Sequence, residues 1–77
     1  MKPEHLERYC QLGLKIGYYR RLRGLTQEQL AEIVDVSAGY IGHLEAQNID
    51  KAPSLDVLFD IADALDIPPH KFIDFDV

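Results

Sequence analysis

The sequence of 77 residues predicts an all-α fold in one domain that spans residues 1–77. Apolar residues recur at helical spacing in successive segments, and Gly, Pro, Ser or Thr stands near the ends of these segments. Between residues 26 and 45, two such segments follow each other so closely that their helices cannot lie side by side. No segment shows the alternating pattern of a strand. These observations indicate a small helical protein.

The first helix is expected from about residue 3 or 4 to residue 23. Proline suits the first helical turn, and Gly24 supplies a stop. Gly13 and Gly17 each weaken this helix by about 1 kcal/mol relative to alanine, so tertiary packing has to hold it. We interpret both glycines as places where another helix approaches closely.

Two short helices follow, and they form the most informative pattern of the chain. Thr26 is expected to cap the second helix and Ser37 the third. Asp35 stands where a tight turn needs a positive φ, which Asp tolerates better than most residues. Two capped helices of about nine residues, separated by three or four residues, form a helix-turn-helix, which presents a helix to the major groove of DNA. Residues 26–47 are the core of this motif.

The remaining residues predict two more helices. Ser54 caps a fourth helix that continues through Leu65, and its apolar residues cover most of its circumference, as in a helix buried on more than one side. Its three aspartates form a stripe that we interpret as a solvated face. Pro68 and Pro69 break the chain and begin a short fifth helix from His70 to about Phe75.

The charge of the chain is unevenly distributed. A net charge of −5 taken alone argues against binding to nucleic acid. The first 24 residues carry six basic residues against two carboxylates, whereas residues 25–77 carry eleven carboxylates against two lysines. The basic first third therefore permits local phosphate contacts, and the acidic remainder should weaken non-specific affinity for DNA.

Other features of the sequence narrow the class of function. No apolar run approaches the roughly 18 residues of a membrane span and no signal peptide opens the chain, so we expect a cytoplasmic protein without membrane contact. The single cysteine, Cys10, fits a reducing compartment and is interpreted as a small core residue. The three histidines lack metal-ligand spacing and no phosphate-binding loop occurs, so we expect no metal, no cofactor, no small-molecule substrate and no enzymatic activity.

One ordered set of residues spans most of the chain. It consists of Leu12-Gly13, Ile16, Arg20, Gly24-Leu25-Thr26-Gln27-Glu28-Gln29-Leu30-Ala31, Val36-Ser37, Tyr40-Ile41, Leu44-Glu45, Pro53-Ser54-Leu55, Ile61-Ala62, Ala64-Leu65 and Pro68. This set resembles the phage-repressor and Cro-type helix-turn-helix family, also called the xenobiotic response element family, over about residues 12–75. The resemblance implies a five-helix, lambda-repressor-like domain that binds double-stranded DNA.

The resemblance also implies roles for single residues. Gln27 matches the position that anchors to a phosphate. Arg20 and Glu45 match a pair that forms a structural salt bridge between the first and third helices. Both charges also fall on otherwise apolar helical faces, where each needs a partner. Arg21 and Arg23 are either phosphate contacts or side chains that satisfy the last carbonyls of their helix.

The candidate DNA-binding residues lie on the third helix and beside it. They are Thr26, Gln27, Ser37, Ala38, Gly39, Tyr40, His43, Gln47, Asn48 and Lys51. The base-reading positions of the family match Ala38, Gly39 and His43, and Tyr40 is equally interpretable as a packing aromatic. The first two turns lack the Arg, Lys, Asn or Gln of bidentate base readout, so we expect modest direct specificity, supplemented by DNA shape and dimer spacing.

The C-terminal tail and the outward side of the fourth helix carry more apolar residues than a monomer of this size should expose. One domain contacts few base pairs, and the family solves this by dimerising. We therefore predict a two-fold homodimer through Ile67, Phe72, Ile73, Phe75 and Val77. The predicted function is a sequence-specific transcriptional regulator, similar to a repressor or a restriction-modification controller. The alternative is a protein-interaction module or antitoxin-type partner with weak DNA binding, which the acidic surface and poor reader residues favour.

Overall fold

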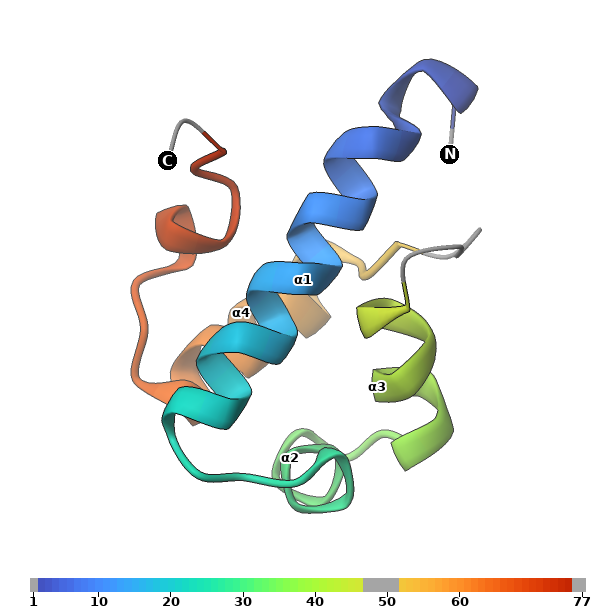
Figure 1. The fold of residues 1–77 in the computed structure, drawn as a ribbon. Coiled ribbons are helices and arrows are strands. Elements are labelled where there is room, and N and C mark those ends of the chain that lie inside the picture. The colour runs from blue at the N-terminus through green and yellow to red at the C-terminus, as the bar shows by residue number, and fades with distance from the viewer. Residues whose placement is uncertain (1, 47–51, 76–77) are drawn as a thin grey trace.

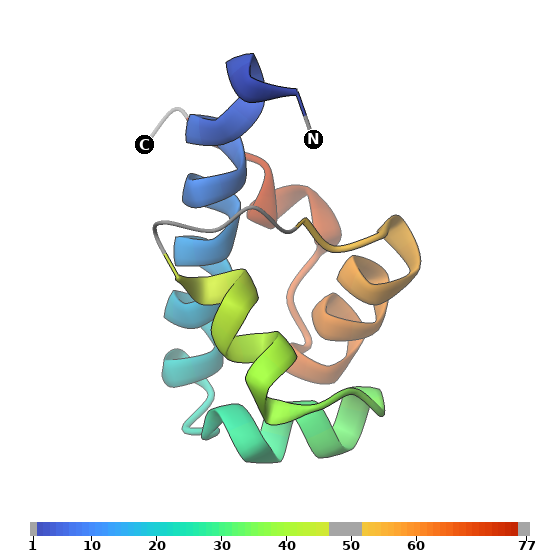
Figure 2. The same ribbon diagram turned by 90° about the vertical axis from the view of Figure 1, so that its right-hand side faces the viewer.

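The computed structural model describes residues 2–46 and 52–75, which form four α-helices, two 3-10 turns and no strand. The elements are η1 (Pro3–His5), α1 (Leu6–Leu22), α2 (Gln27–Val34), α3 (Ala38–Glu45), α4 (Leu55–Leu65) and η2 (Pro69–Phe72). In Figure 1, α1 crosses the front of the molecule, with α3 on one side and the C-terminal segment on the other. Figure 2 shows α2 below α3, and α4 on the far side from α1. The expected all-α class and helix-turn-helix architecture are confirmed.

Both ends of the described chain differ from the expected helices. The first helix begins as the 3-10 turn η1, and it ends at Leu22 rather than Arg23. The fifth helix expected from His70 to about Phe75 is not confirmed, because the only helical turn in this described segment is the 3-10 turn η2 at Pro69–Phe72. There the N–H of Lys71 donates to Pro68 O at 3.0 Å and that of Ile73 to His70 O at 3.2 Å, each three residues back. These are the bonds of a 3-10 turn rather than of an α-helix.

The three predicted helix caps are confirmed. The hydroxyls of Thr26, Ser37 and Ser54 each accept a hydrogen bond from the N–H three residues later, at 3.1, 3.0 and 3.2 Å. At Thr26 the cap is reciprocal, because Gln29 Oε1 accepts from the Thr26 N–H at 2.8 Å. Asp35 ends α2 with φ 59°, the left-handed conformation expected for the tight turn. Local hydrogen bonds thus fix where each of these helices begins and where α2 ends.

The core lies between all four α-helices and η2. Its buried apolar residues are Leu12, Ile16, Leu30, Ala31, Ile41, Leu44, Leu58, Ile61, Ala62, Leu65 and Phe72. Phe72 is 0 % exposed, and its ring meets the edge of Tyr19 at a centroid distance of 5.3 Å. The expectation that Phe72 lies on a dimer surface is therefore wrong, because its ring is buried within the protomer. Cys10, expected in the core, is only half-buried.

The backbones of α1 and α3 touch where α1 carries glycine. A Cβ built at Gly13 would overlap the carbonyl oxygen of Leu44. At Gly17 the same atom would lie 3.0 Å from the Glu45 carboxylate. The interpretation of these glycines as close-approach points is confirmed, and the contact sets how α3 sits against the body.

Arg23 joins the end of α1 to the end of α4. Its Nε donates to Leu65 O at 2.7 Å, and its Nη2 donates to Asp66 O at 3.0 Å. Asp66 closes α4 in the left-handed conformation with φ 54°. Arg23 therefore satisfies carbonyl groups at a helix end, which is one of the two roles predicted from the sequence. The carbonyls belong to α4 and its cap, however, and not to the helix that carries Arg23. Within the described residues, every helix is too short or too polar to cross a membrane.

Candidate nucleic-acid interface

The turn between α2 and α3 is held by both backbone and side chains. The N–H of Val36 donates to Ala31 O at 3.0 Å, across the left-handed residue Asp35. Ala31, Ile41 and Leu44 are all buried where the two helices meet. One side of α3 is thereby fixed to the protein, which leaves its opposite side facing solvent.

The outward side of α3 carries two of the three expected base-reading residues. Gly39 and His43 are exposed and lie four residues apart, so they are neighbours on one helical face. Ala38 and Tyr40 are half-buried and pack against the core. Their side chains are thus partly withdrawn from the outward face. Ser37 is exposed and its hydroxyl caps α3.

Arg20 and Glu45 form the salt bridge that the resemblance implies. Arg20 Nε lies 2.7 Å from Glu45 Oε2, and Arg20 Nη2 donates to Oε1 at 3.0 Å. The third nitrogen, Nη1, donates to Leu25 O at 2.7 Å. The hydrogen bonds that Arg20 donates to Glu45 raise the pKa of Arg20 while burial lowers it, and the charges of Glu45 and Glu28 raise it further. This pair ties α1 to α3 and to the loop before α2.

Gln27 completes the same cluster, which sequence reasoning did not predict. Its Nε2 donates to Glu45 Oε1 at 3.1 Å. Its side-chain oxygen would lie 3.5 Å from a Cβ at Gly42, so the amide spans the gap between α2 and α3. Among the described residues, no buried side-chain nitrogen or oxygen lacks a hydrogen-bond partner. We name Arg20, Gln27 and Glu45 the polar cluster.

The other expected site residues are dispersed. Thr26 is exposed at the start of α2. Gln47, Asn48, Lys51 and Val77 lie outside the described residues. Of the expected dimer residues, Ile67 and Phe75 are half-buried against the core, whereas Ile73 is 58 % exposed.

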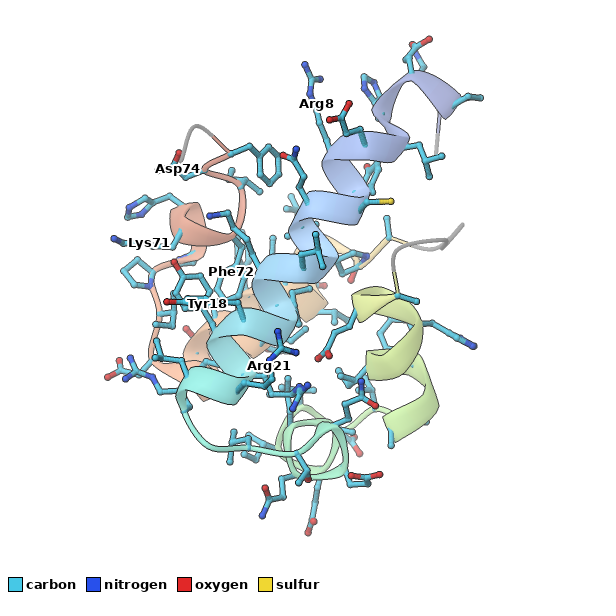
Figure 3. All side chains as sticks on the ribbon, in the orientation of Figure 1. Arg8, Tyr18, Arg21, Lys71, Phe72 and Asp74 are labelled. Atoms are coloured by element: carbon cyan, nitrogen blue, oxygen red, sulfur yellow. The ribbon has the colours of Figure 1, made fainter. Side chains whose placement is uncertain are left out.

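The hollows in the surface lie away from the outward side of α3. One of about 500 Å³ is lined by Leu14, Lys15, Tyr18, Tyr19, Lys71 and Asp74. Figure 3 shows Tyr18, Lys71 and Asp74 on the side of α1 that faces away from α3. Within residues 2–46 and 52–75, no three His, Cys, Asp or Glu side chains come together as metal ligands. The candidate site is therefore an exposed helical face and not a pocket.

Comparison with known proteins agrees with this geometry. The family profile described as Helix-turn-helix matches residues 16–72. The uncharacterised HTH-type transcriptional regulator YazB of Bacillus subtilis is 35 % identical over 65 residues, covering 77 % of this chain and 91 % of YazB. The HTH-type transcriptional regulator SinR of the same organism is 30 % identical over 63 residues, covering 82 % of this chain and 56 % of SinR.

Solved structures show the same similarity. SinR in complex with DNA superimposes with a TM-score of 0.74 at 30 % identity, covering 82 % of this chain and 98 % of that one. The restriction-modification controller protein C.AhdI from Aeromonas hydrophila gives a TM-score of 0.76 at 30 % identity, covering 83 % and 94 %. A complex of SinR with SinI gives 0.75 at 30 % identity, covering 83 % and 61 %.

Proposed function

The chain belongs to the Cro-type helix-turn-helix family of transcriptional regulators, and on that premise we propose that it binds operator DNA as a homodimer through the outward face of α3. The observation that carries this proposal is the pair Gly39 and His43, exposed on a helix whose opposite side is fixed by buried residues. A flat helical face without a pocket suits the edge of a base pair rather than a small substrate. The family is a DNA-binding type and not an enzyme class. A regulator of this kind acts in the cytoplasm, where its operator lies.

Contacts to the DNA backbone position the reading helix. Thr26 and Gln27 open α2, and Ser37 opens α3 with its N–H groups directed outward from the helix start. Asn48 and Lys51 remain candidates from the sequence for further phosphate contacts, and Gln47 remains a candidate for the groove. Gln27 also holds Glu45, so Gln27→Ala would disturb the fold as well as a phosphate contact.

Direct base readout rests on few groups. Ala38 can contact a thymine methyl, Gly39 permits close approach, and His43 can donate or accept a hydrogen bond. None of them forms a bidentate pair with guanine or adenine, so DNA shape and half-site spacing have to supply much of the specificity. This predicts an operator with two half-sites one helical turn apart, about 34 Å from centre to centre.

His43→Ala tests the reading face. We expect it to weaken binding to the operator by about 0.5–1.5 kcal/mol for each protomer, the net value of a single hydrogen bond, without a change in melting temperature, because His43 is exposed. The operator is first obtained by selection from a random duplex pool, and affinities are then measured by fluorescence anisotropy. His70→Ala is the matched control, since His70 is exposed on η2, away from α3. Equal affinity and base preference in wild type and His43→Ala would remove His43 from the site.

The dimer surface is proposed around Ile73, with the outward side of α4. Ile73 is 58 % exposed, and Leu55 and Phe59 on α4 are 67 % and 45 % exposed. Ile73→Glu is expected to shift the protein from dimer to monomer in sedimentation velocity, because a carboxylate would be buried without a partner. Ile33→Glu is the matched control, since Ile33 is 57 % exposed but lies on α2. A dimer that survives Ile73→Glu, or is lost equally in Ile33→Glu, would contradict this surface.

A second function is favoured by the charge distribution. Residues 25–77 carry eleven carboxylates against two lysines, which weakens attraction to DNA. SinR is also known in a complex with SinI. A protein-interaction module on the same fold, such as an antitoxin-type partner, would not bind random duplex DNA at low salt with the salt dependence of phosphate contacts.

A further inference from the structure

We propose that Arg21 is a phosphate-binding residue of the DNA interface, placed at the end of α1 near the Glu45 carboxylate to which Gln27 also bonds. The inference rests on the proposed function and assigns a cation to it that the family resemblance does not. From the sequence alone, Arg21 can be either a phosphate contact or a side chain that satisfies the last carbonyls of its helix. The structure separates it from Arg23, which is committed to the carbonyls of Leu65 and Asp66.

The position of the Arg21 guanidinium follows from the side chains that surround Gly17. A Cβ built at Gly17 would lie 3.1 Å from Arg21 Nη1 and 3.0 Å from Glu45 Oε1. The same Glu45 oxygen accepts the hydrogen bond from Gln27 Nε2 at 3.1 Å. The Arg21 guanidinium and the Glu45 carboxylate therefore lie on the same side of α1, within about 6 Å of each other. Figure 3 shows the Arg21 side chain at the α2 end of α1, on the front of the molecule.

The lack of a side chain at Gly17 leaves room beside it for the ends of the Arg21 and Glu45 side chains. A larger residue there would meet both the guanidinium and the Glu45 carboxylate. Within the part of the chain that the structure describes, Arg20 rather than Arg21 forms the ion pair with Glu45. Arg21 is exposed, so its guanidinium can turn outward to a ligand.

The charge of Arg21 decides whether the group of charged side chains at this end of α1 is neutral or negative. Arg20 and Glu45 neutralise each other, and Glu28, exposed in the first turn of α2, is close enough to raise the pKa of Arg20. In the sum over these four side chains, the positive charge of Arg21 offsets the negative charge of Glu28. Without Arg21, a phosphate at the start of α2 would meet a net negative group of side chains instead of a neutral one.

The chemistry of the place fits a DNA phosphate. A guanidinium can donate two parallel hydrogen bonds to phosphate oxygens, and its charge is retained at every working pH. The start of α2 adds free N–H groups and the positive end of a helix dipole. In a helix-turn-helix docked on DNA, the first helix of the motif crosses the backbone while the second enters the major groove. Arg21 stands beside that first helix.

The test compares Arg21→Gln with Arg8→Gln. Both arginines are exposed on α1, and 13 residues of helix separate them by about 20 Å, so the two variants lose the same charge at different places. Binding of each variant to a fluorescein-labelled random-sequence duplex is measured by anisotropy over a series of salt concentrations. The slope of log K against log salt reports the number of neutralised phosphates, with about 0.9 for each contact.

We expect Arg21→Gln to reduce this slope by about 0.9 for each protomer bound, and Arg8→Gln to leave it at the wild-type value. Arg21→Lys should restore the slope, because lysine keeps the charge. A slope unchanged in Arg21→Gln, or reduced equally in Arg8→Gln, would overturn the inference. If His43→Ala still weakens operator binding in that case, the proposed DNA-binding function is retained and only the role of Arg21 is rejected. Wild-type protein that shows no salt-dependent binding would overturn both.

Discussion

Gly13→Ala is expected to destabilise the protein more than any other addition of a single methyl group to a glycine of α1 or α3. The new Cβ would overlap the carbonyl oxygen of Leu44, and both groups belong to the main chain. Relief therefore requires α1 and α3 to move apart. Overpacking costs about 1–3 kcal/mol even where side chains can shift, whereas the gain in helix propensity is at most about 1 kcal/mol. A net loss of about 2 kcal/mol or more is a large part of the stability of a small domain.

Three glycines provide the measurement and its controls. A Cβ at Gly39 meets nothing within 4 Å, and one at Gly17 meets only the ends of two flexible side chains. In urea unfolding followed by circular dichroism, we therefore expect Gly39→Ala to be the most stable variant, Gly17→Ala to be intermediate and Gly13→Ala to be the least stable. Gly13→Ala as stable as Gly39→Ala would mean that α1 and α3 are not in backbone contact.

Features fixed by nearby residues could be predicted from the sequence. A Ser or Thr hydroxyl reaches an N–H only three residues away, so the caps at Thr26, Ser37 and Ser54 are visible in the local sequence. The left-handed Asp35 is equally local. The burial of the C-terminal tail could not be predicted from nearby residues, because an apolar residue such as Phe72 can pack either into the core of its own protomer or against a partner. Only packing against Tyr19, far away in the sequence, decides which.

The difference between local and distant contacts also explains which residues of the candidate site could be predicted. His43 could be placed on the outward face because Ile41 and Leu44 already occupy the inner one. The partners of long polar side chains could not be predicted, because Gln27 bonds a residue 18 positions away and Arg23 one 42 positions away. The pairing of Arg20 with Glu45 came from the family resemblance. Periodicity showed only that each charge needed a partner.

Glu45→Ala is the second substitution expected to have a large effect. It removes the carboxylate that accepts from Arg20 Nε and Nη2 and leaves only Leu25 O as a partner for that guanidinium. The two side chains are 10 % and 9 % exposed, so water replaces the lost bonds poorly. Breaking a buried pair in this way costs about 3–5 kcal/mol. Gln27 loses its acceptor in the same step.

A double-mutant cycle separates the ion pair from simple loss of packing. Arg20→Met with Glu45→Leu replaces both charges by apolar side chains, which removes the uncompensated buried charge that makes the single substitution costly. In the cycle of wild type, Arg20→Met, Glu45→Leu and the double variant, we expect the double variant to be more stable than Glu45→Leu alone, with a coupling free energy of about 1–3 kcal/mol in urea unfolding. Additive losses would mean that the pair contributes little. Because Gln27 bonds the same carboxylate, an intact fold with altered DNA binding in the double variant would show that the polar cluster positions the phosphate contacts as well as holding α1 to α3.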